Sequence, residues 1–199
     1  MEKLGLAVFI SGSGSNLQAL IDACKSPEYP AQIKLVISNR PDAYGLERAQ
    51  NEAIKAICID HKKYKTRAEF ENALSEELSK HKIDLICLAG FMRILTADFI
   101  NKWPNKIINT HPALLPKFGG EGMYGEHVHR AVLKAKEKES GASIHFVIPE
   151  VDKGQLIAQG TVPVLENDTI ESLSARVIAQ EHILYPQAVK KIALERLSK

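Results

Sequence analysis

The chain has 199 residues, of which 45% are hydrophobic and 25% are charged, a composition typical of a folded domain rather than a disordered or fibrous chain. Its 26 basic and 24 acidic residues give a formal charge of +2 and are spread along the chain, so no nucleic-acid surface is expected. No stretch reaches 18 apolar residues and the first residues lack a signal-peptide pattern, so we expect a cytoplasmic protein without membrane spans.

Strands and helices are expected to alternate through the first half of the chain. Short apolar runs predict strands at 4–10, 33–37, 54–59, 84–89 and 106–108. Helical spacing of apolar residues predicts helices over 17–24, 43–52, 66–80 and 94–100. This alternation predicts right-handed crossovers and an open, mostly parallel twisted sheet with helices on both faces, an α/β fold in a single domain.

After residue 112 the pattern changes. Residues 114–125 are rich in Gly and Pro and predict a loop, followed by a helix at 126–138. Two further strands, at 142–148 and 155–164, are expected to extend the sheet in antiparallel fashion. Asp168 to Glu171 fits a capping box that opens a long C-terminal helix, which Pro186 should kink or interrupt.

The cysteines and histidines do not predict a metal site. Cys24, Cys58 and Cys87 are odd in number, lack metal-ligand spacing and lie in apolar runs, so we expect buried free thiols. His127 and His129 lie two residues apart in a predicted helix and cannot face one ion together. These two and His145 are better explained as surface and strand residues, and no metal is expected.

The segment 109–112, Asn-Thr-His-Pro, is the strongest candidate for a catalytic site. In an extended chain Asn109 and His111 point to the same face while Thr110 points away, and Pro112 ends the strand. A primary amide beside an imidazole can stabilise an oxyanion, and the imidazole can move a proton near neutral pH. The pattern therefore indicates acyl transfer, although a strand-end histidine beside a turn-forming asparagine would give the same four residues.

The loop Gly12-Ser13-Gly14-Ser15-Asn16 is a candidate anion site. It lies between the first strand and the first helix, where backbone N–H groups and the helix dipole favour an anion. Leu17 stands where a dinucleotide fingerprint needs glycine, and a triphosphate loop would need Lys followed by Ser or Thr. The loop therefore suits a single phosphate group, with a tight turn and an asparagine cap as the plainer alternative.

Other candidate residues follow neighbouring strands. Ligands of parallel sheets bind outside the carboxyl ends of the strands, so the phosphate loop, residues 90–93 and residues 109–112 should share one edge. Asp152 lies between the last two predicted strands and would raise the pKa of His111 if it is close to it. As a lone loop aspartate it could equally be an ordinary turn residue.

With these residues assembled, the chain resembles the folate-dependent phosphoribosylglycinamide formyltransferase family of purine biosynthesis. The likeness extends from about residue 6 to 188. It rests on six segments in the family's order: 11–23 (SGSGSNLQALIDA), 38–49 (SNRPDAYGLERA), 88–95 (LAGFMRIL), 108–118 (INTHPALLPKF), 141–159 (GASIHFVIPEVDKGQLIAQ) and 175–186 (ARVIAQEHILYP). The shorter Asn-x-His and Leu-Leu-Pro pattern is shared by a wider group of folate enzymes that transfer or hydrolyse formyl groups.

The resemblance implies roles for particular residues. The family's catalytic trio falls on Asn109, His111 and Asp152. Its substrate phosphate and glycinamide contacts fall on Gly14, Ser15, Asn16, Gly90, Pro112 and Glu181. Its folate pocket falls on Arg67, Leu88, Met92, Arg93, Ile94, Leu95, Asn109, Ile148, Glu150, Val151 and Asp152. The stretch 119–127 is longer than in some members, and Ser143 replaces a Thr or Cys, a change that suggests packing.

The resemblance also implies the reaction and the fold. A formyl group would pass from 10-formyltetrahydrofolate, as co-substrate, to the amine of glycinamide ribonucleotide, without a metal or a covalent enzyme intermediate. The Rossmann-like formyltransferase fold would occupy residues 1–199 as one domain. Its phosphate-binding half would be about 1–100 and its catalytic and folate-binding half about 84–199. The partners would be these two small molecules, with the protein a monomer or a homodimer.

Other functions remain open at the level of the sequence. Within the enzyme class, the alternatives are a formyltetrahydrofolate hydrolase or a transferase that acts on formylmethionyl-tRNA or a sugar nucleotide. The hydrolase usually carries an extra N-terminal domain and the tRNA enzyme an extra C-terminal domain, for which the sequence leaves no room. A phosphometabolite sensor on the same fold is the alternative outside catalysis.

Overall fold

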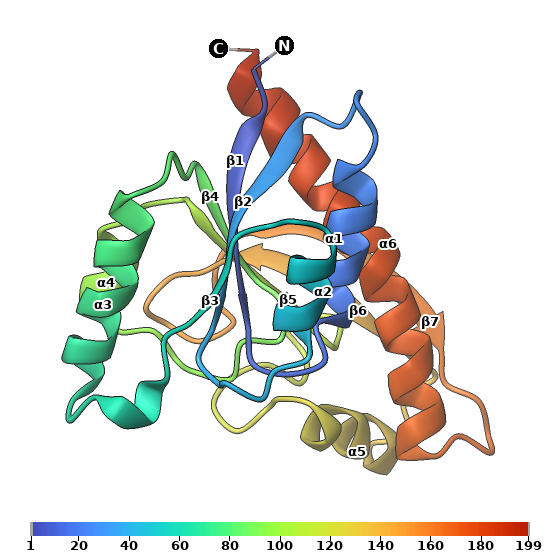
Figure 1. Ribbon diagram of the computed structural model, residues 1–199. Coiled ribbons are helices and arrows are strands. Elements are labelled where there is room, and N and C mark those ends of the chain that lie inside the picture. Colours follow the sequence, from blue (N-terminus) through green and yellow to red (C-terminus); the bar gives the residue numbers. More distant parts are fainter. Residues whose placement is uncertain (1, 199) are drawn as a thin grey trace.

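A single seven-stranded sheet, in the order β3-β2-β1-β4-β5-β6-β7, organises the computed structural model, which describes residues 2–198 (Figure 1). The strands are β1 (Leu4–Ile10), β2 (Ala31–Ser38), β3 (Ala56–Cys58), β4 (Leu85–Leu88), β5 (Ile107–His111), β6 (Glu139–Phe146) and β7 (Leu156–Pro163). Neighbouring strands from β3 to β5 are parallel, and the β5–β6 and β6–β7 pairs are antiparallel. The expected sheet and its antiparallel extension are confirmed.

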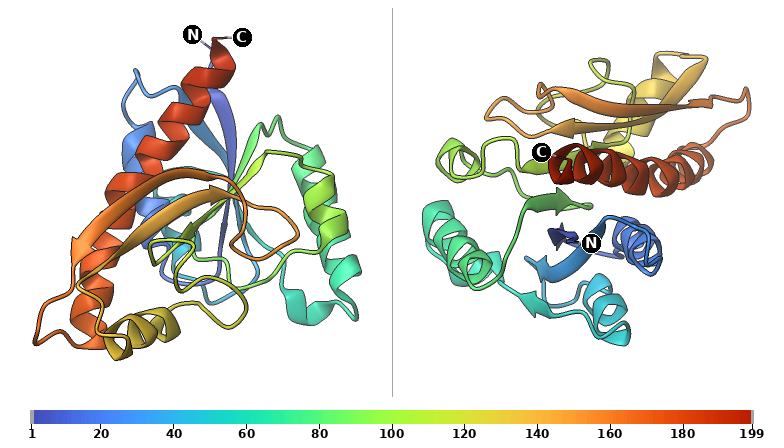
Figure 2. Two further views of the ribbon diagram at one scale, coloured as in Figure 1. Left: turned by 180° about the vertical axis from the view of Figure 1, so that it is seen from behind. Right: turned by 90° about the horizontal axis from the view of Figure 1, so that it is seen from above.

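Helices cover both faces of the sheet (Figure 2). They are α1 (Ser15–Cys24), α2 (Gly45–Asn51), α3 (Arg67–Ser79), α4 (Ala97–Asn101), α5 (Glu126–Lys134) and α6 (Ile170–Leu197), with a short 3-10 helix η1 (His61–Lys63). Side chains of α1, α2, α5 and α6 pack against one face, and those of α3 and α4 against the other. The central strand β1 is apolar throughout because both of its faces are buried. Val8 and Ile10 pack in the core beneath α1, α2, α5 and α6, whereas Ala7 and Phe9 pack in the core beneath α3 and α4.

The strand order places a switch point between β1 and β4. From β1 the chain proceeds outward to β2 and β3, then returns to pair β4 with the other side of β1. Open α/β sheets bind ligands at such a point, outside the carboxyl ends of the strands. The loops that follow β1, β4 and β5 therefore lie where a ligand is expected.

Two predicted helices are shorter in the structure. The helix expected at 94–100 begins only at Ala97, because the Thr96 hydroxyl accepts a hydrogen bond from the Phe99 N–H (3.2 Å) and caps α4 there. The helix expected at 126–138 ends at Lys134, because Lys136 takes a left-handed φ of 53° and β6 starts at Glu139.

The long final helix differs from expectation at its start and in its middle. The capping box is formed by Thr169 and Ser172, not by Asp168 and Glu171. The predicted interruption at Pro186 is wrong, because α6 is continuous through that residue. The Pro186 carbonyl accepts a hydrogen bond from the Tyr29 hydroxyl (2.7 Å), and packing of the apolar face of α6 compensates for the missing backbone N–H.

The prediction of a buried thiol is wrong for Cys58. Cys87 is buried and Cys24 partly buried, but Cys58 is exposed because β3 is a three-residue strand at the sheet edge. All three are free thiols. Within residues 2–198, no group of three or more His, Cys, Asp or Glu residues could hold a metal ion, and no helix is long and apolar enough to cross a membrane.

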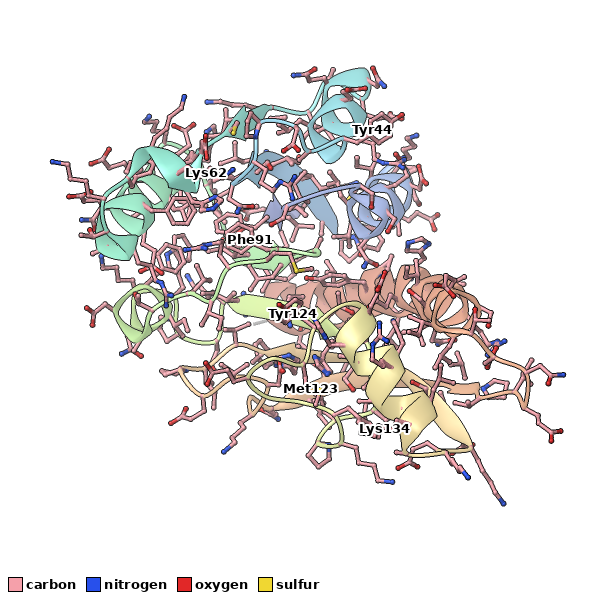
Figure 3. All side chains as sticks on the ribbon, turned by 90° about the horizontal axis from the view of Figure 1, so that it is seen from below. Tyr44, Lys62, Phe91, Met123, Tyr124 and Lys134 are labelled. Carbon is pink, nitrogen blue, oxygen red and sulfur yellow. The ribbon has the colours of Figure 1, made fainter. Side chains whose placement is uncertain are left out.

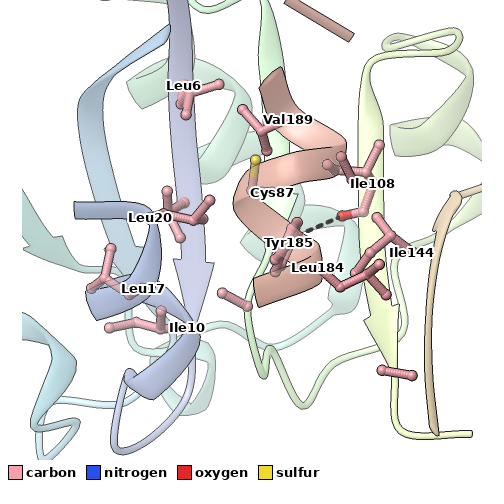
Figure 4. Packing of buried hydrophobic residues seen from close by; sticks show 14 of the residues in the cluster. Leu6, Ile10, Leu17, Leu20, Cys87, Ile108, Ile144, Leu184, Tyr185 and Val189 are labelled. Carbon is pink, nitrogen blue, oxygen red and sulfur yellow. Dashed lines mark hydrogen bonds between the residues drawn. The ribbon is translucent and has the colours of Figure 1, made fainter. Parts of the chain in front are cut away.

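We expect the Tyr185 hydroxyl to stabilise the centre of the sheet. From the buried face of α6, its single hydrogen is shared between the backbone carbonyls of Leu88 in β4 (3.0 Å) and Ile108 in β5 (3.3 Å). Figure 4 shows the contact with Ile108. Tyr185→Phe should lower the free energy of unfolding by about 1–1.5 kcal/mol, measured by urea denaturation, because one buried hydrogen-bond donor is removed. The exposed Tyr124→Phe is the control, and equal stabilities for both variants would contradict the prediction.

Candidate active site

The end of β5 presents its side chains alternately to the two faces of the sheet. The Thr110 hydroxyl donates to Glu181 of α6 (2.9 Å), so Thr110 points toward that helix. Asn109 and His111 point to the other face, where β6 places His145 opposite Asn109 and Ser143 opposite His111. The alternation of a strand therefore brings the amide and the imidazole together, as the sequence pattern predicts.

Both ring nitrogens of His111 face acceptors of this chain. The side chain is 3% exposed, and its Nε2 lies 2.7 Å from the Phe118 carbonyl oxygen. Its Nδ1 lies 3.4 Å from Asp152 Oδ2, which also accepts a hydrogen bond from the Gly120 N–H (3.0 Å). A neutral imidazole has one N–H and can donate to only one of these acceptors, whereas an imidazolium can donate to both.

The charged form of His111 is nevertheless disfavoured by burial. Burial lowers the pKa of His111, and this outweighs the nearby Asp152 carboxylate and the Phe118 carbonyl, which raise it. The carboxylate acts in the direction expected from the sequence, but the predicted net rise in the pKa of His111 is wrong. Burial also raises the pKa of Asp152, yet hydrogen bonds from His145 and Gly120 prevail and hold it below its usual value. The proton of the pair is therefore weakly held by His111.

His145 is a site residue that sequence reasoning missed. The sequence predicts an ordinary strand histidine, but its Nε2 lies 3.3 Å from Asn109 Nδ2 and 3.5 Å from Asp152 Oδ1. Its Nδ1 lies 2.9 Å from the Phe146 carbonyl oxygen. Unprotonated, Nε2 can accept from the Asn109 amide, and protonated, it can donate to Asp152, but it cannot do both at once. In either state His145 lies against the Asn109 side chain. The feature of the sequence that could have indicated this role is a single histidine within an otherwise apolar strand.

Ser143 has a polar role that its size did not suggest. Its hydroxyl is buried and donates to the Ala113 carbonyl (2.6 Å), while it accepts from the Leu115 N–H (3.0 Å) and from Gln159 Nε2 (2.8 Å). It thus fixes the turn that follows His111. The expectation that Ser143 is a matter of packing is incomplete.

The loop after β1 is shaped by α2. Gly14 has a left-handed φ of 68°, and a Cβ there would lie 2.7 Å from the Gly45 Cα at the start of α2. The Gly45 N–H donates to the Gly12 carbonyl (3.1 Å). No side chain caps α1. The expected asparagine cap is therefore absent, although the tight turn is present, and the role of the loop in anion binding stays a prediction.

Asn16 joins this loop to a buried carboxylate. It is 7% exposed, and its Nδ2 donates to Oε2 of Glu181 (2.8 Å), which is 5% exposed. Burial raises the pKa of Glu181, although the hydrogen bonds from Asn16 and Thr110 oppose the rise. Glu181 thus lies between the loop after β1 and the end of β5, although the two segments are distant in sequence.

The loop after β4 is anchored to the end of β1. The Met92 N–H donates to the Ser11 hydroxyl (2.7 Å), and the rings of Phe91 and Phe9 lie 5.3 Å apart between centroids. Met92 and Ile94 are 56% and 52% exposed and available to a ligand. Figure 3 looks onto this edge of the sheet, where Phe91 and Tyr124 both lie.

The remaining predicted folate and substrate residues vary in exposure. Leu88 and Leu95 are buried and could form only the base of a pocket, whereas Arg93 is partly exposed. Arg67 is the exposed first residue of α3. Other predicted contacts are partly or fully exposed: Gly90, Pro112, Ile148, Glu150 and Val151. Their contact with ligands stays a prediction.

Comparison with known proteins gives a consistent result over most of the chain. Residues 4–189 match the model of the formyl transferase family. The chain is 48% identical over 193 residues to the trifunctional purine biosynthetic protein adenosine-3 of Chironomus tentans. This match covers 96% of this chain but only 14% of that protein. It is 42% identical to the phosphoribosylglycinamide formyltransferase of Haemophilus influenzae, with 96% and 88% of the two chains covered.

A solved structure agrees with these sequence relatives. Glycinamide ribonucleotide transformylase 1 from Symbiobacterium toebii has a TM-score of 0.92 and 43% identity, over 98% of this chain and 89% of that one. The chain therefore spans most of the length of single-function relatives and a small part of the trifunctional one.

We expect the imidazole of His111 to titrate below the ordinary value of about 6.5, and Asp152→Asn to move its titration lower still. Because the pKa of His111 is lower in the folded than in the unfolded protein, the unfolded state binds more protons between the two values, and stability falls as the pH drops through that window. NMR titration of the imidazole tests this. An unmoved titration in Asp152→Asn would contradict it, and the exposed Asp98→Asn is the control.

Proposed function

The chain belongs to the formyl transferase family, and on that premise we propose that it transfers the formyl group of 10-formyltetrahydrofolate to the amine of 5'-phosphoribosylglycinamide, in purine biosynthesis. The observation that carries the proposal is the juxtaposition of Asn109, His111 and Asp152 at the carboxyl edge of the sheet, beside a loop suited to one phosphate. Relatives of nearly the same length bear the name of this activity.

The alternatives are less well supported. A hydrolase that releases formate has no use for a phosphate loop, and the relatives that match most of their own length are glycinamide transformylases. A sensor without catalysis would not need an acid–base pair next to an amide donor. We therefore favour transfer to the glycinamide amine. The division into a phosphate-binding part, about 1–100, and a catalytic and folate part, about 84–199, belongs to this proposal.

The reaction requires charge stabilisation and one proton transfer. The neutral amine attacks the formyl carbon, and negative charge develops on the formyl oxygen. The bond from that carbon to the folate nitrogen then breaks, and the proton lost by the amine ends on the folate nitrogen. Holding both substrates in one site converts a bimolecular step into a step within a complex and supplies much of the rate.

Asn109 is the proposed donor to the developing oxyanion. When His145 Nε2 is unprotonated it accepts one hydrogen of this amide, and the second hydrogen can be directed at the formyl oxygen without reorganisation during the reaction. The backbone of β5 holds the side chain on the face that it shares with His111.

His111 and Asp152 are proposed to relay the proton. Because burial lowers the pKa of His111, its imidazolium is a stronger acid than a free imidazolium and gives its proton more readily to the leaving nitrogen. Asp152 keeps the positive charge compensated while it lasts. Nε2 is engaged by the Phe118 carbonyl, so a substrate atom that takes this proton must displace that carbonyl.

Binding is assigned to the loops on either side of the switch point. The N–H groups of Gly14, Ser15 and Asn16 would hold the phosphate, with Glu181 behind them. The exposed side chains of Met92 and Ile94 would contact the folate ring system.

The decisive experiment is direct. The protein is incubated with glycinamide ribonucleotide and 10-formyltetrahydrofolate, and formylated product is sought by mass spectrometry. Formate release without formylated nucleotide would instead indicate the hydrolase, and absence of both would leave the sensor.

Asn109→Ala should raise the activation free energy by about 2.7–4 kcal/mol, a loss of roughly 100- to 1000-fold in kcat, by analogy with removal of a single oxyanion donor. Asn101→Ala, an exposed asparagine at the end of α4, is the control and should retain full turnover. A turnover for Asn109→Ala within a factor of two of the parent would remove the amide from the mechanism.

A folate analogue that cannot donate a formyl group should raise the thermal unfolding temperature. At about 100 times its dissociation constant, it should stabilise the protein by about 2.7 kcal/mol, because it binds only the folded state. Ile94→Arg should abolish this protection. Ile183→Arg on α6 is the matched control, since the two isoleucines are 52% and 56% exposed. The folate assignment fails if saturating analogue leaves the parent's melting curve unchanged.

A further inference from the structure

A hollow of about 410 Å³ opens beside the loop after β1. It is lined by Ser15, Gln18, Ala19, Asp22, Arg48 and His182. Helix α1 supplies the first four of these residues, α2 supplies Arg48 and α6 supplies His182, and α1 lies between the other two helices (Figure 1). Two basic side chains from different helices therefore border the same space as the first residue of α1.

Arg48 is held against the loop by three contacts. Its Nε donates to the Ser13 carbonyl (2.8 Å), its Nη1 donates to Gln18 Oε1 (3.2 Å), and its guanidinium carbon lies 4.9 Å from the centroid of the Tyr44 ring. In the part of the chain that the structure describes, no carboxylate forms an ion pair with Arg48. The charge is thus fixed in place without being neutralised.

His182 has a ring nitrogen without a partner. Its Nε2 is buried, and none of residues 2–198 offers it a hydrogen bond. Burial lowers the pKa of His182, and the positive charge of Arg48 lowers it further. Unsatisfied buried polar atoms are rare in folded proteins and require an explanation, which a ligand can supply.

The charge balance of the loop explains what ligand would need these residues. A phosphate monoester carries between one and two negative charges near neutral pH. The loop 12–16 offers N–H groups and hydroxyls but no basic side chain, and Asn16 is in contact with the carboxylate of Glu181. A dianion bound there needs positive charge from outside the loop.

We propose that the Arg48 guanidinium and a ring N–H of His182 form the donor wall of the substrate's phosphate site, with Arg48 supplying the positive charge. The inference rests on the proposed function, because it assigns the loop to the phosphate of glycinamide ribonucleotide. Nη2 of Arg48 makes no hydrogen bond within the described chain and is free to donate to a phosphate oxygen. His182 Nε2 gains its missing partner from another oxygen of the same group. Both are binding residues and take no part in the transfer step.

The test separates binding of the phosphate from catalysis. Arg48→Ala should raise KM for glycinamide ribonucleotide at least about tenfold, as expected for the loss of a charge-assisted hydrogen bond. His182→Gln should raise it less. Neither variant should change kcat or the KM of the formyl donor by more than about twofold, because the reacting atoms are untouched. Lys190→Ala removes an exposed charge two turns further along α6 and is the matched control.

A substrate without phosphate shows which group is recognised. With glycinamide ribonucleoside, Arg48→Ala and the parent should have the same kcat/KM. A loss of equal size for the nucleoside and the nucleotide would overturn the proposal, since it would mean a general distortion of the loop. An unchanged KM for the nucleotide would overturn it as well.

Titration with inorganic phosphate gives an answer that does not depend on turnover. Phosphate should shift the imidazole NMR signals of His182 in the parent and in Lys190→Ala but not in Arg48→Ala. If phosphate binds in this way while the parent fails to formylate glycinamide ribonucleotide, the proposed function is wrong and the anion site stands. If the parent formylates the substrate but phosphate leaves His182 unchanged, the donor wall is wrong and the function stands.

Discussion

The buried carboxylate of Glu181 is the contact on which the arrangement of the site depends. It accepts hydrogen bonds from Asn16 at the start of α1 and from Thr110 near the end of β5, and so joins two elements that lie on either side of the switch point. Burying a carboxylate is unfavourable unless donors compensate, and burial does raise its pKa. Because these donors come from segments 94 residues apart in sequence, the site can form only when the sheet is complete.

Two opposing effects act on the protonation of His111. Its surroundings contain two acceptors and call for an imidazolium, while its burial favours the neutral ring. Neither influence is decisive alone, so the proton is retained weakly, which suits a group that must release it during a reaction. Asp152 reaches this place from a loop residue with a left-handed φ of 57°, a conformation that costs roughly 1–2 kcal/mol for a residue with a side chain. The hydrogen bond from Gly120 and the contacts with two histidines offset that cost.

The sequence predicts much of this fold because its main signals are local. A continuous apolar run such as β1 and the two-residue alternation at Asn109 and His111 depend on neighbouring residues and survive in the structure. The errors come from tertiary contacts. Pro186 does not end α6 because the rest of that helix is packed, and Cys58 is exposed because β3 lies at an edge. The direction in which the pKa of His111 shifts depends on burial, and the contacts of His145 depend on the antiparallel register of β6 with β5. Neither burial nor register can be read from the sequence pattern or the composition.

In the site, the side chains proposed to donate protons or hydrogen bonds lie on strands, and the groups that accept from His111 lie on loops. Asn109 and His111 belong to a strand paired on both sides, and His145 belongs to its neighbour, so the proposed oxyanion donor and the proposed proton-carrying ring are held by the sheet. Their acceptors, the Phe118 carbonyl and the Asp152 carboxylate, lie on loops. A rigid donor set can be aimed at charge that develops in the transition state, whereas acceptors on loops can move when a substrate takes their place. Strand register thus fixes the positions of the donors, and the loops allow a substrate to replace the acceptors of His111.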